Sequence, residues 1–224
     1  MGWLISDEHF ALPIRNELSA APRDAIDGIG ALEHVLLIDH HDSFTQLIRN
    51  YLEQLGASVS VVQSGDVALE QVETLAPTRV VLSPGPGAPE SAAATQAFIL
   101  QYYRKYPMLG ICLGHQCLMA AFQGQVVQAT DICHGKSYHI HHAGQGILSG
   151  VPTPFFATRY HSLVASNHAI PRDWEVTAWT YDAKEQFVIM GVQHQTYPLF
   201  GLQYHPEAIL TQHGRLIFKH FFCF

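Results

Sequence analysis

A cysteine flanked by glycines is the residue of this chain best placed for covalent chemistry. Cys112 lies in the segment 110–116, which follows the apolar run Met108-Leu109 and precedes the apolar run Leu118–Phe122, so it falls where a strand is expected to turn into a helix. Gly110 and Gly114 permit a sharp turn and keep neighbouring side chains away from the sulfur. The free amides and positive dipole end of the following helix favour thiolate over thiol. The pattern predicts a nucleophile elbow, and the alternative is a cysteine packed as a small apolar side chain.

A histidine with a nearby acid supplies a candidate base. In the segment Tyr204-His205-Pro206-Glu207, residues two apart share a face if the backbone is extended, so His205 and Glu207 are expected side by side, with the proline fixing the turn. The carboxylate would hold the imidazole in the tautomer that accepts a thiol proton. The chain contains 15 histidines, most of which must be surface or packing residues. The position of His205 after a strand and beside an acid distinguishes it from them.

A loop rich in proline and glycine completes the set. The segment Ser83–Glu90 reads Ser-Pro-Gly-Pro-Gly-Ala-Pro-Glu and follows an apolar run. Its prolines stiffen the backbone and its glycines let the chain pass close to a ligand, although an ordinary turn fits the same composition. It does not match G-x-G-x-x-G, so no dinucleotide site is predicted. Because ligands bind outside the carboxyl ends of strands in open α/β sheets, we expect the nucleophile, the base and this loop to meet there, with loop amides available to an oxyanion.

The segments that would position these residues alternate between strands and helices from His34 onward. Continuous apolar strands separated by helices are typical of a parallel sheet covered on both faces. We therefore predict an α/β fold with an open, mostly parallel, twisted sheet and helices on both faces. The predicted strands are 35–39, 58–62, 79–83 and 108–111, and the predicted helices are 43–55, 66–75, 90–103 and 113–122.

The second half of the chain has a different pattern. After Gln125 helices nearly disappear and short strand candidates follow one another, which predicts a smaller region of antiparallel strands. A final amphipathic helix is expected to cover one face of the sheet. The predicted strands of this half are 155–159, 174–179, 187–190 and 199–204, and the predicted helix is 211–222.

Composition and charge exclude several classes of function. The chain has 224 residues, 48% hydrophobic and 14% charged, which suits one domain with a substantial core. A formal net charge of −7 without any Lys/Arg cluster argues against a nucleic-acid surface. No apolar run approaches the ~20 residues that span a bilayer, and acids near the start do not fit a secretory signal. Four cysteines without a paired spacing suit a reducing compartment, so we expect a cytoplasmic protein that binds neither nucleic acid nor membrane.

The start of the chain differs from the rest. Residues 1–33 carry six acids against two arginines and end in a loose Asp-Gly-Ile-Gly stretch at 27–30. We interpret residues 1–33 as an acidic N-terminal extension or linker. The single predicted domain then comprises residues 34–224.

Several motifs in combination resemble one enzyme family. The Pro-Gly-Pro-Gly loop at 84–87, the Gly-x-Cys-x-Gly-His-Gln elbow at 110–116 and the His-Pro-Glu at 205–207 are similar to those of class I (triad) glutamine amidotransferases. Within that class the chain resembles the subunits that serve chorismate-aminating enzymes, anthranilate synthase component II and the amidotransferase of aminodeoxychorismate (para-aminobenzoate) synthase. The motifs that carry this second resemblance are Asp-Ser-Phe at 42–44, His-Gly-Lys at 134–136 and Arg-Tyr-His-Ser-Leu-Val at 159–164.

The resemblance implies a role for each residue. Cys112 would attack the side-chain amide of L-glutamine, and the backbone amides of Gly87 and Leu113 would hold the oxyanion. His205 would protonate the departing ammonia and then activate water against the glutamyl thioester, with Glu207 orienting it. The ammonia would pass to a partner, a chorismate-binding synthase subunit, and no metal or organic cofactor is implied in this subunit. The residues implied to hold glutamine are Gly85, Pro86, Gly87, Leu113, Gln116, Ser162 and Leu163.

The chain departs from the family pattern at two places. The family reads Asp-Asn-x-Asp-Ser-Phe after the first strand, whereas residues 39–44 read Asp-His-His-Asp-Ser-Phe. Histidine in place of asparagine at position 40 is expected to change hydrogen bonding in a loop near the partner surface. The family's His-Pro-Glu-Ser ends here in Ala208, which spares both the base and the acid.

Other functions remain open at this level. A cysteine hydrolase of γ-glutamyl peptides on the same fold would release an amino acid or peptide instead of ammonia, and Gln116 and the 160–163 segment argue against it. A non-catalytic subunit that only stabilises a partner would require a damaged triad, and this one is intact. The histidines at 139, 141 and 142 lack a cysteine or carboxylate in a recognised spacing, so no metal site is predicted. The motifs do not separate anthranilate from aminodeoxychorismate as the product.

Overall fold

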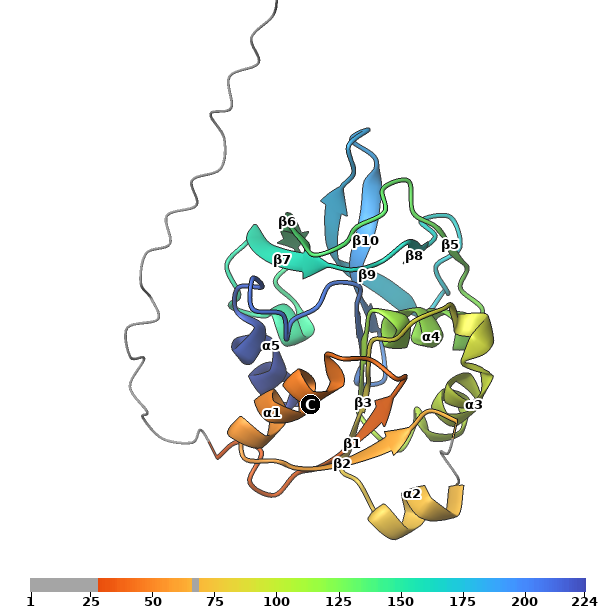
Figure 1. Cartoon of the computed structure of the whole chain (residues 1–224), viewed down its shortest axis with the longest axis vertical. Helices are drawn as coiled ribbons and strands as arrows, with labels where there is room; N and C mark the ends of the chain where they lie inside the picture. Colours follow the sequence, from red (N-terminus) through yellow and green to blue (C-terminus); the bar gives the residue numbers. More distant parts are fainter. Residues whose placement is uncertain (1–27, 66–68) are drawn as a thin grey trace, which may run out of the picture.

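Five apolar segments form adjacent parallel strands in the computed structural model, which describes residues 28–65 and 69–224. Their order across the sheet is β2-β1-β3-β4-β11. Figure 1 labels the first three, β2, β1 and β3. Every residue of β3 and β4 is buried, as continuous apolar character requires of a strand covered on both faces. The five strands are β1 (His34–Asp39), β2 (Ser58–Gln63), β3 (Arg79–Leu82), β4 (Met108–Ile111) and β11 (Leu199–Leu202).

The second half of the chain extends this sheet with antiparallel strands. Beyond β11 the order continues β10-β9-β6-β7, which gives nine strands in one sheet within the described residues. The strands are β10 (Phe187–His194), β9 (Trp174–Tyr181), β6 (Lys136–His142) and β7 (Phe155–Arg159), and a separate pair is formed by β5 (Val126–Gln128) and β8 (Leu163–Ala165). The predicted fold class, a parallel α/β sheet with an antiparallel region, is confirmed.

Helices cover both faces of the sheet, because the side chains of each central strand alternate between them. In β1, Val35 and Leu37 belong to one core cluster, whereas Leu36 and Ile38 belong to the other. The first face is covered by α1 (Thr45–Gln54), α5 (Gly214–Phe221) and the 3₁₀ turn η2 (Gly146–Leu148). The second face is covered by α2 (Leu69–Leu75), α3 (Ala93–Tyr102) and α4 (Leu113–Ala121) (Figure 1).

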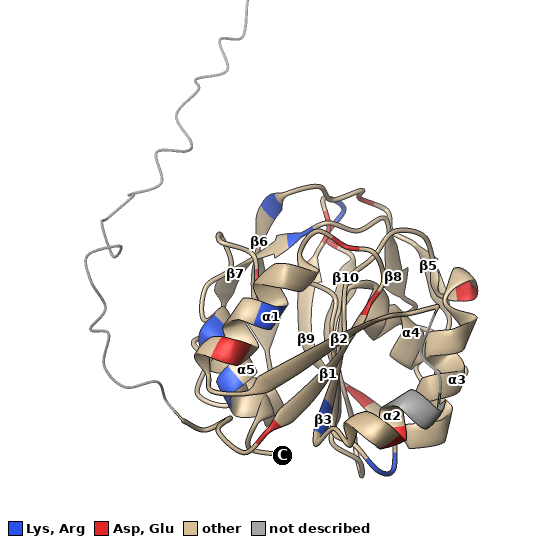
Figure 2. Cartoon of the chain, turned by 60° about the horizontal axis from the view of Figure 1, so that its bottom comes forward, with Lys and Arg blue, Asp and Glu red and all other residues tan. Residues whose placement is uncertain are grey.

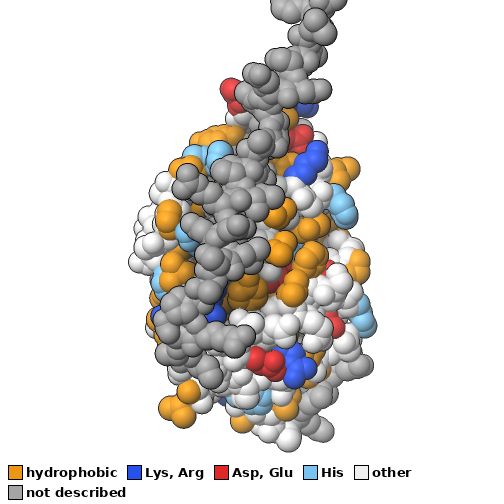
Figure 3. Space-filling model, turned by 60° about the vertical axis from the view of Figure 1, so that its left-hand side comes forward, with side chains coloured by type: hydrophobic (Ala, Val, Ile, Leu, Met, Phe, Trp, Pro, Cys, Tyr) orange, Lys and Arg blue, Asp and Glu red, His pale blue; other side chains and the backbone are white. Residues whose placement is uncertain are grey.

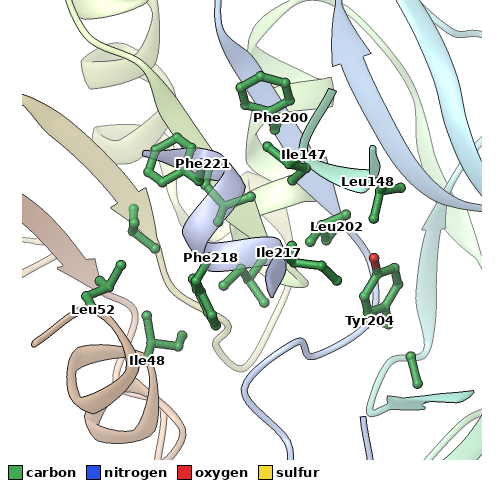
Figure 4. Close-up of a cluster of buried hydrophobic side chains, with 14 of the residues drawn as sticks. Ile48, Leu52, Ile147, Leu148, Phe200, Leu202, Tyr204, Ile217, Phe218 and Phe221 are labelled. Carbon is green, nitrogen blue, oxygen red and sulfur yellow. The ribbon is translucent and has the colours of Figure 1, made fainter. Parts of the chain in front are cut away.

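The C-terminal helix α5 anchors the segment that leads to His205. Its Ile217 and Phe218 lie between α1 and the end of β11 (Figure 4). Tyr204, which directly precedes His205, is fully buried in the same cluster. Full burial of each large apolar side chain stabilises the fold by about 1.5–3 kcal/mol, so this end of the sheet is firmly held.

Some element boundaries differ from the predictions. The helix predicted over 90–103 begins as the 3₁₀ turn η1 (Pro89–Ser91) and becomes α3 only at Ala93. The strand predicted over 199–204 ends at Leu202, and the last helix begins at Gly214 instead of 211. Three strands, β5, β6 and β8, were not predicted. The sequence of β6 is Lys-Ser-Tyr-His-Ile-His-His, and such a polar, half-exposed strand is stabilised by its neighbours more than by its own pattern.

Residues 28–33 lie against the domain. The amide of Gly30 donates to the carbonyl of Leu55 at 3.0 Å, and the Glu33 carboxylate pairs with the Arg79 guanidinium at 2.9 Å. The remainder of the predicted extension, residues 1–27, lies outside the described residues. The prediction of a linker there stays a prediction.

Charged side chains are sparse over the described surface. Lysine, arginine, aspartate and glutamate lie scattered over the elements (Figure 2). On the face seen in Figure 3, basic and acidic side chains occur singly or beside one another among hydrophobic and uncharged ones. Among the described helices, none has both the length and the apolar character required to cross a bilayer.

Candidate active site

Cys112 occupies a sharp turn between β4 and α4. Its backbone has φ 52° and ψ −103°, a conformation that costs a non-glycine residue of order 1–3 kcal/mol. Hydrogen bonds on both sides hold it: the Cys112 amide donates to the carbonyl of Leu202 at 2.8 Å, and the Gln116 amide donates to the carbonyl of Cys112 at 3.1 Å. This is the geometry of a nucleophile elbow, in which contacts with neighbouring segments hold one residue in a strained backbone conformation.

The glycines of the elbow are required by close packing. A Cβ at Gly114 would lie 2.4 Å from the carbonyl oxygen of Leu82, and a Cβ at Gly110 would lie 2.5 Å from the carbonyl carbon of Gly114. Both distances are far below van der Waals contact. The glycines therefore let the start of α4 approach β3 and β4, which places Cys112 at the carboxyl ends of the strands.

His205 and Glu207 form a buried pair. Nδ1 of His205 lies 2.7 Å from Oε1 of Glu207, and the two residues are 1% and 2% exposed. Since a carboxylate only accepts, Nδ1 carries the hydrogen and donates it. Thr158 accepts the backbone hydrogen of His205 at 3.0 Å, and the rings of Phe44 and Tyr160 each lie 5.1 Å from the imidazole.

The other ring nitrogen of His205 is left available. Nε2 is buried and has no hydrogen-bond partner among the described residues. Burial by itself lowers the pKa of His205, but the charge of Glu207 and the proximity of Cys112 outweigh it and raise the pKa to about 10. The pair therefore favours an imidazolium that can donate a proton from Nε2.

A cavity of about 170 Å³ opens over the cysteine. It exceeds the about 10–15 Å³ that one water needs, so it admits a small ligand. Six of the residues predicted to hold glutamine line it together with Cys112, and Tyr160 and His161 are added by the structure. The lining residues are Gly85, Pro86, Gly87, Cys112, Gln116, Tyr160, His161, Ser162 and Leu163.

Leu113 is the predicted binding residue that does not line the cavity. Its side chain is 3% exposed and packs in the core beneath the glycine loop. The role implied for Leu113 uses its backbone amide, so the burial of its side chain leaves that prediction in place. The oxyanion contacts of Gly87 and Leu113 stay predictions.

The glycine loop packs directly on His40. A Cβ at Gly85 would lie 2.4 Å from Cβ of His40, and Gly87 has φ +86°, a value that favours glycine. The His40 ring is 4% exposed, donates from Nδ1 to the carbonyl of Ser83 at 3.0 Å and accepts at Nε2 from the hydroxyl of Thr95 at 2.9 Å. Burial lowers the pKa of His40, consistent with this neutral tautomer.

The structure places the two neighbouring histidines differently. The His40 ring points into the fold and supports the loop before Gly87, whereas His41 is exposed, and the expected effect on partner docking stays a prediction. The departure from asparagine therefore acts through the glycine loop. The sequence pattern alone does not indicate which of two adjacent histidines faces inward.

Two further polar residues at the site were not predicted as site residues. Gln203 is fully buried, and its Nε2 lies 3.7 Å from the sulfur of Cys112. Arg159 donates from Nε to Nε2 of His161 at 2.9 Å. Burial, followed by the charge of Arg159, lowers the pKa of His161 to about 3, so a neutral imidazole faces the cavity. A glutamine at the end of the apolar run 199–202 is the sequence signal that would have indicated Gln203.

The histidines at 139, 141 and 142 do not form a ligand cluster. His142 donates from Nε2 to the carbonyl of Pro152 at 3.2 Å and accepts the amide hydrogen of Gly144 at Nδ1. In the part of the chain that the structure describes, no group of three or more histidine, cysteine, aspartate or glutamate side chains is placed to hold a metal ion.

His115 gives the fold a pH dependence that can be measured. Both ring nitrogens are buried and lack a hydrogen-bond partner among the described residues. Burial lowers the pKa of His115 to about 3, below the about 6.5 of an exposed histidine. Between about pH 6.5 and the folded pKa, His115 is therefore protonated in the unfolded chain but neutral in the folded chain. The free energy of unfolding is consequently highest above about pH 6.5 and falls as the pH decreases toward the folded pKa.

Replacing His115 with leucine should weaken this dependence. Leucine has a similar volume, and no partner is left unpaired, so the fold should persist. Between about pH 6 and pH 4 the free energy of unfolding should fall less steeply than in the original chain, by up to about 1.4 kcal/mol per pH unit. Urea unfolding at a series of pH values measures this, with His168→Leu, a change at an exposed histidine, as control. Equal slopes for His115→Leu and the original chain would contradict the assignment.

Comparison with known proteins agrees with the geometry. Residues 36–223 match the family model described as glutamine amidotransferase class-I. The chain is 45% identical over 188 residues to anthranilate synthase component 2 of Pseudomonas aeruginosa, covering 84% of this chain and 94% of that protein. It is 41% identical over 187 residues to aminodeoxychorismate synthase component 2 of Escherichia coli, covering 84% and 98%. The crystal structure of a glutamine amidotransferase from Thermotoga maritima shares the fold, with a TM-score of 0.63 at 19% identity, covering 79% and 76%.

Proposed function

Because the chain belongs to the class I glutamine amidotransferase family, we propose that it hydrolyses glutamine through Cys112, His205 and Glu207 and passes the ammonia to a separate synthase that binds chorismate. The observation that supports this best is the buried His205–Glu207 pair, whose free Nε2 lies close to a strained cysteine at the floor of a small cavity. A protein that only stabilised a partner would have no need of these costly features.

The first half of the reaction forms a thioester. The sulfur of Cys112 attacks the side-chain carbonyl carbon of glutamine, and the carbonyl oxygen becomes an oxyanion held by the amides of Gly87 and Leu113. As the tetrahedral intermediate collapses, Nε2 of the His205 imidazolium gives its proton to the nitrogen, which leaves as ammonia. The raised pKa of His205 supports this step, because the imidazole is protonated before the bond breaks.

The second half of the reaction hydrolyses the thioester and regenerates the free Cys112. His205, now neutral, takes a proton from water at Nε2, and the resulting hydroxide attacks the thioester carbonyl carbon. The carbon–sulfur bond breaks, glutamate leaves, and the sulfur departs as thiolate beside the reprotonated imidazole. Glu207 keeps its hydrogen bond to Nδ1 throughout and fixes which nitrogen reacts. The proposed steps require no metal or organic cofactor from this chain.

The partner is inferred from the relatives. Both the Pseudomonas and the Escherichia relatives are named component 2 of a synthase, and they match at 45% and 41% identity. We therefore propose a chorismate-aminating synthase of either kind as the ammonia acceptor. The four cysteines are all free thiols, which supports a location in the cytoplasm.

Glutaminase activity should depend on that partner. The isolated chain is expected to hydrolyse glutamine slowly, and addition of the synthase with chorismate should raise the rate by about tenfold or more, because docking completes the site and avoids wasteful hydrolysis. Release of glutamate measures the rate, and a γ-glutamyl dipeptide in place of glutamine serves as the competing substrate. Full activity without any partner would contradict the proposal, as would faster cleavage of the dipeptide.

A further inference from the structure

Two side-chain amides connect Cys112 to Leu163, the first residue of β8 and a lining residue of the cavity. Nε2 of Gln116 lies 3.0 Å from the carbonyl oxygen of Leu163 and 3.1 Å from Oε1 of Gln203. Nε2 of Gln203 in turn lies 3.7 Å from the sulfur of Cys112. Gln203 is fully buried and Gln116 is 3% exposed, so the contacts that Gln203 makes with Gln116 and with the sulfur are shielded from bulk solvent.

The direction of each hydrogen bond follows from its partners. The carbonyl of Leu163 only accepts, so the group of Gln116 that faces it must be the NH₂ group. That group has two hydrogens, and the second reaches Oε1 of Gln203. The oxygen of the Gln203 amide is thereby assigned, and its NH₂ group is the end that faces Cys112.

Because an amide NH₂ group can only donate a hydrogen bond, the sulfur of Cys112 must accept it. We propose that Gln203 is a catalytic residue that donates a hydrogen bond to the Cys112 sulfur and stabilises its thiolate; this rests on the proposed function of Cys112 as nucleophile. Hydrogen bonds to charged groups are about twice as strong as neutral ones, so the contact strengthens whenever the sulfur carries charge. The sulfur carries it twice, before attack on glutamine and again as it leaves the thioester.

The backbone around Gln203 is well suited to fix this donor. Its own amide donates to the carbonyl of Met190 on β10 at 2.9 Å. The preceding residue, Leu202, accepts the amide hydrogen of Cys112 at 2.8 Å. The cysteine and its donor are therefore tied to each other through both main chain and side chain, and His205 follows two residues later on the same segment.

The same amides connect the sulfur to the substrate cavity. Leu163 and Gln116 both line the cavity, and the NH₂ group of Gln116 contacts Leu163 and Gln203 at once. Two hydrogen-bonding amides therefore connect the lining of the cavity to the sulfur of Cys112.

Alkylation of Cys112 by iodoacetamide tests the proposal without using glutamine. The full chain is alkylated over a range of pH, and the adduct on Cys112 is followed by peptide mass spectrometry. In Gln203→Met, which keeps the side-chain length and removes the donor, the pH of half-maximal alkylation should rise by about one unit or more, and the rate near neutral pH should fall by about tenfold. Gln193→Met, a change at a partly buried glutamine on β10 outside the site, should match the original chain.

A second variant keeps the test decisive if Gln203→Met does not fold. In Gln203→Glu, an oxygen still accepts from Gln116, but the group that faces the sulfur becomes an acceptor. Its alkylation above about pH 8 should be slower than in the original chain, because two negative groups then face each other. Profiles identical to the original chain in the folded variants would overturn the proposal. If the alkylation profile shifts but the original chain shows no glutaminase activity even with the synthase and chorismate, the contact of Gln203 with the sulfur is sustained and the proposed function is rejected.

Discussion

Replacing Cys112 with serine is expected to abolish glutamine-dependent amination of chorismate in the assembled complex while sparing the reaction driven by ammonium salt. A serine hydroxyl is not ionised near neutral pH, and the elbow would present an unactivated oxygen to the amide. The glutamine-dependent rate should fall by about 10⁴-fold or more, as is typical when a covalent nucleophile is removed. The ammonium-driven rate, measured at raised pH where free ammonia is abundant, should stay within about twofold, because ammonia enters after the step that Cys112 performs.

The same assay contains its own controls. Serine differs from cysteine by one atom, so assembly with the synthase should be unaffected, and size-exclusion chromatography checks this. Cys117→Ser is the matched substitution, since Cys117 lies five residues further along on α4 and is fully buried. Loss of the ammonium-driven reaction in a normally assembled Cys112→Ser complex would show that this chain does more than supply nitrogen.

His205 and Glu207 are expected to behave as one unit. His205→Ala should lower glutamine hydrolysis by about 10²–10⁴-fold, the range usual for a general acid or base. Glu207→Gln should also lower it, because the carboxylate is the largest contribution that raises the pKa of His205, and without it the imidazole is less protonated at neutral pH. The double variant should be no slower than His205→Ala by more than about threefold, since Glu207 acts only through the ring.

Steady-state rates of the two single variants and the double variant measure this coupling. His139→Ala, a change at an exposed histidine on β6, should leave the rate unchanged. Independent losses that multiply in the double variant would mean that Glu207 has a role of its own. In that case the 2.7 Å contact between Nδ1 and Oε1 would not describe the working enzyme.

The parts of the fold that the sequence predicted are those with local signals. β1, β3 and β4 are continuous apolar runs, and such runs indicate strands buried on both faces. Gly110 and Gly114 on either side of Cys112 indicate a sharp turn in the sequence itself, so the elbow was predictable as well. The pairing of His205 with Glu207 was also predictable, because it depends on a spacing of only two residues and one proline.

The parts that were missed depend on contacts between distant segments. The ring of His40 faces inward because it forms hydrogen bonds with the Ser83 carbonyl and the Thr95 hydroxyl. Neither residue is near His40 in sequence. Gln203 reaches a sulfur 91 positions away, and its donor direction is set by Gln116. The polar strand β6 exists because β7 and β9 pair with it on either side. Hydrophobic patterns record burial, but they do not record which polar groups meet within the buried region.

Covalent labelling by an electrophilic glutamine analogue, such as a diazo-ketone, tests the central claim most directly. The other thiols are poor competitors: burial raises the pKa of Cys117 to about 12, Cys133 is buried, and Cys223 is exposed but lies outside the cavity that Cys112 lines. Intact mass should show one adduct per chain, peptide mapping should place it on Cys112, and excess glutamine should slow its formation. An adduct on Cys117, Cys133 or Cys223 with Cys112 unmodified would contradict the account.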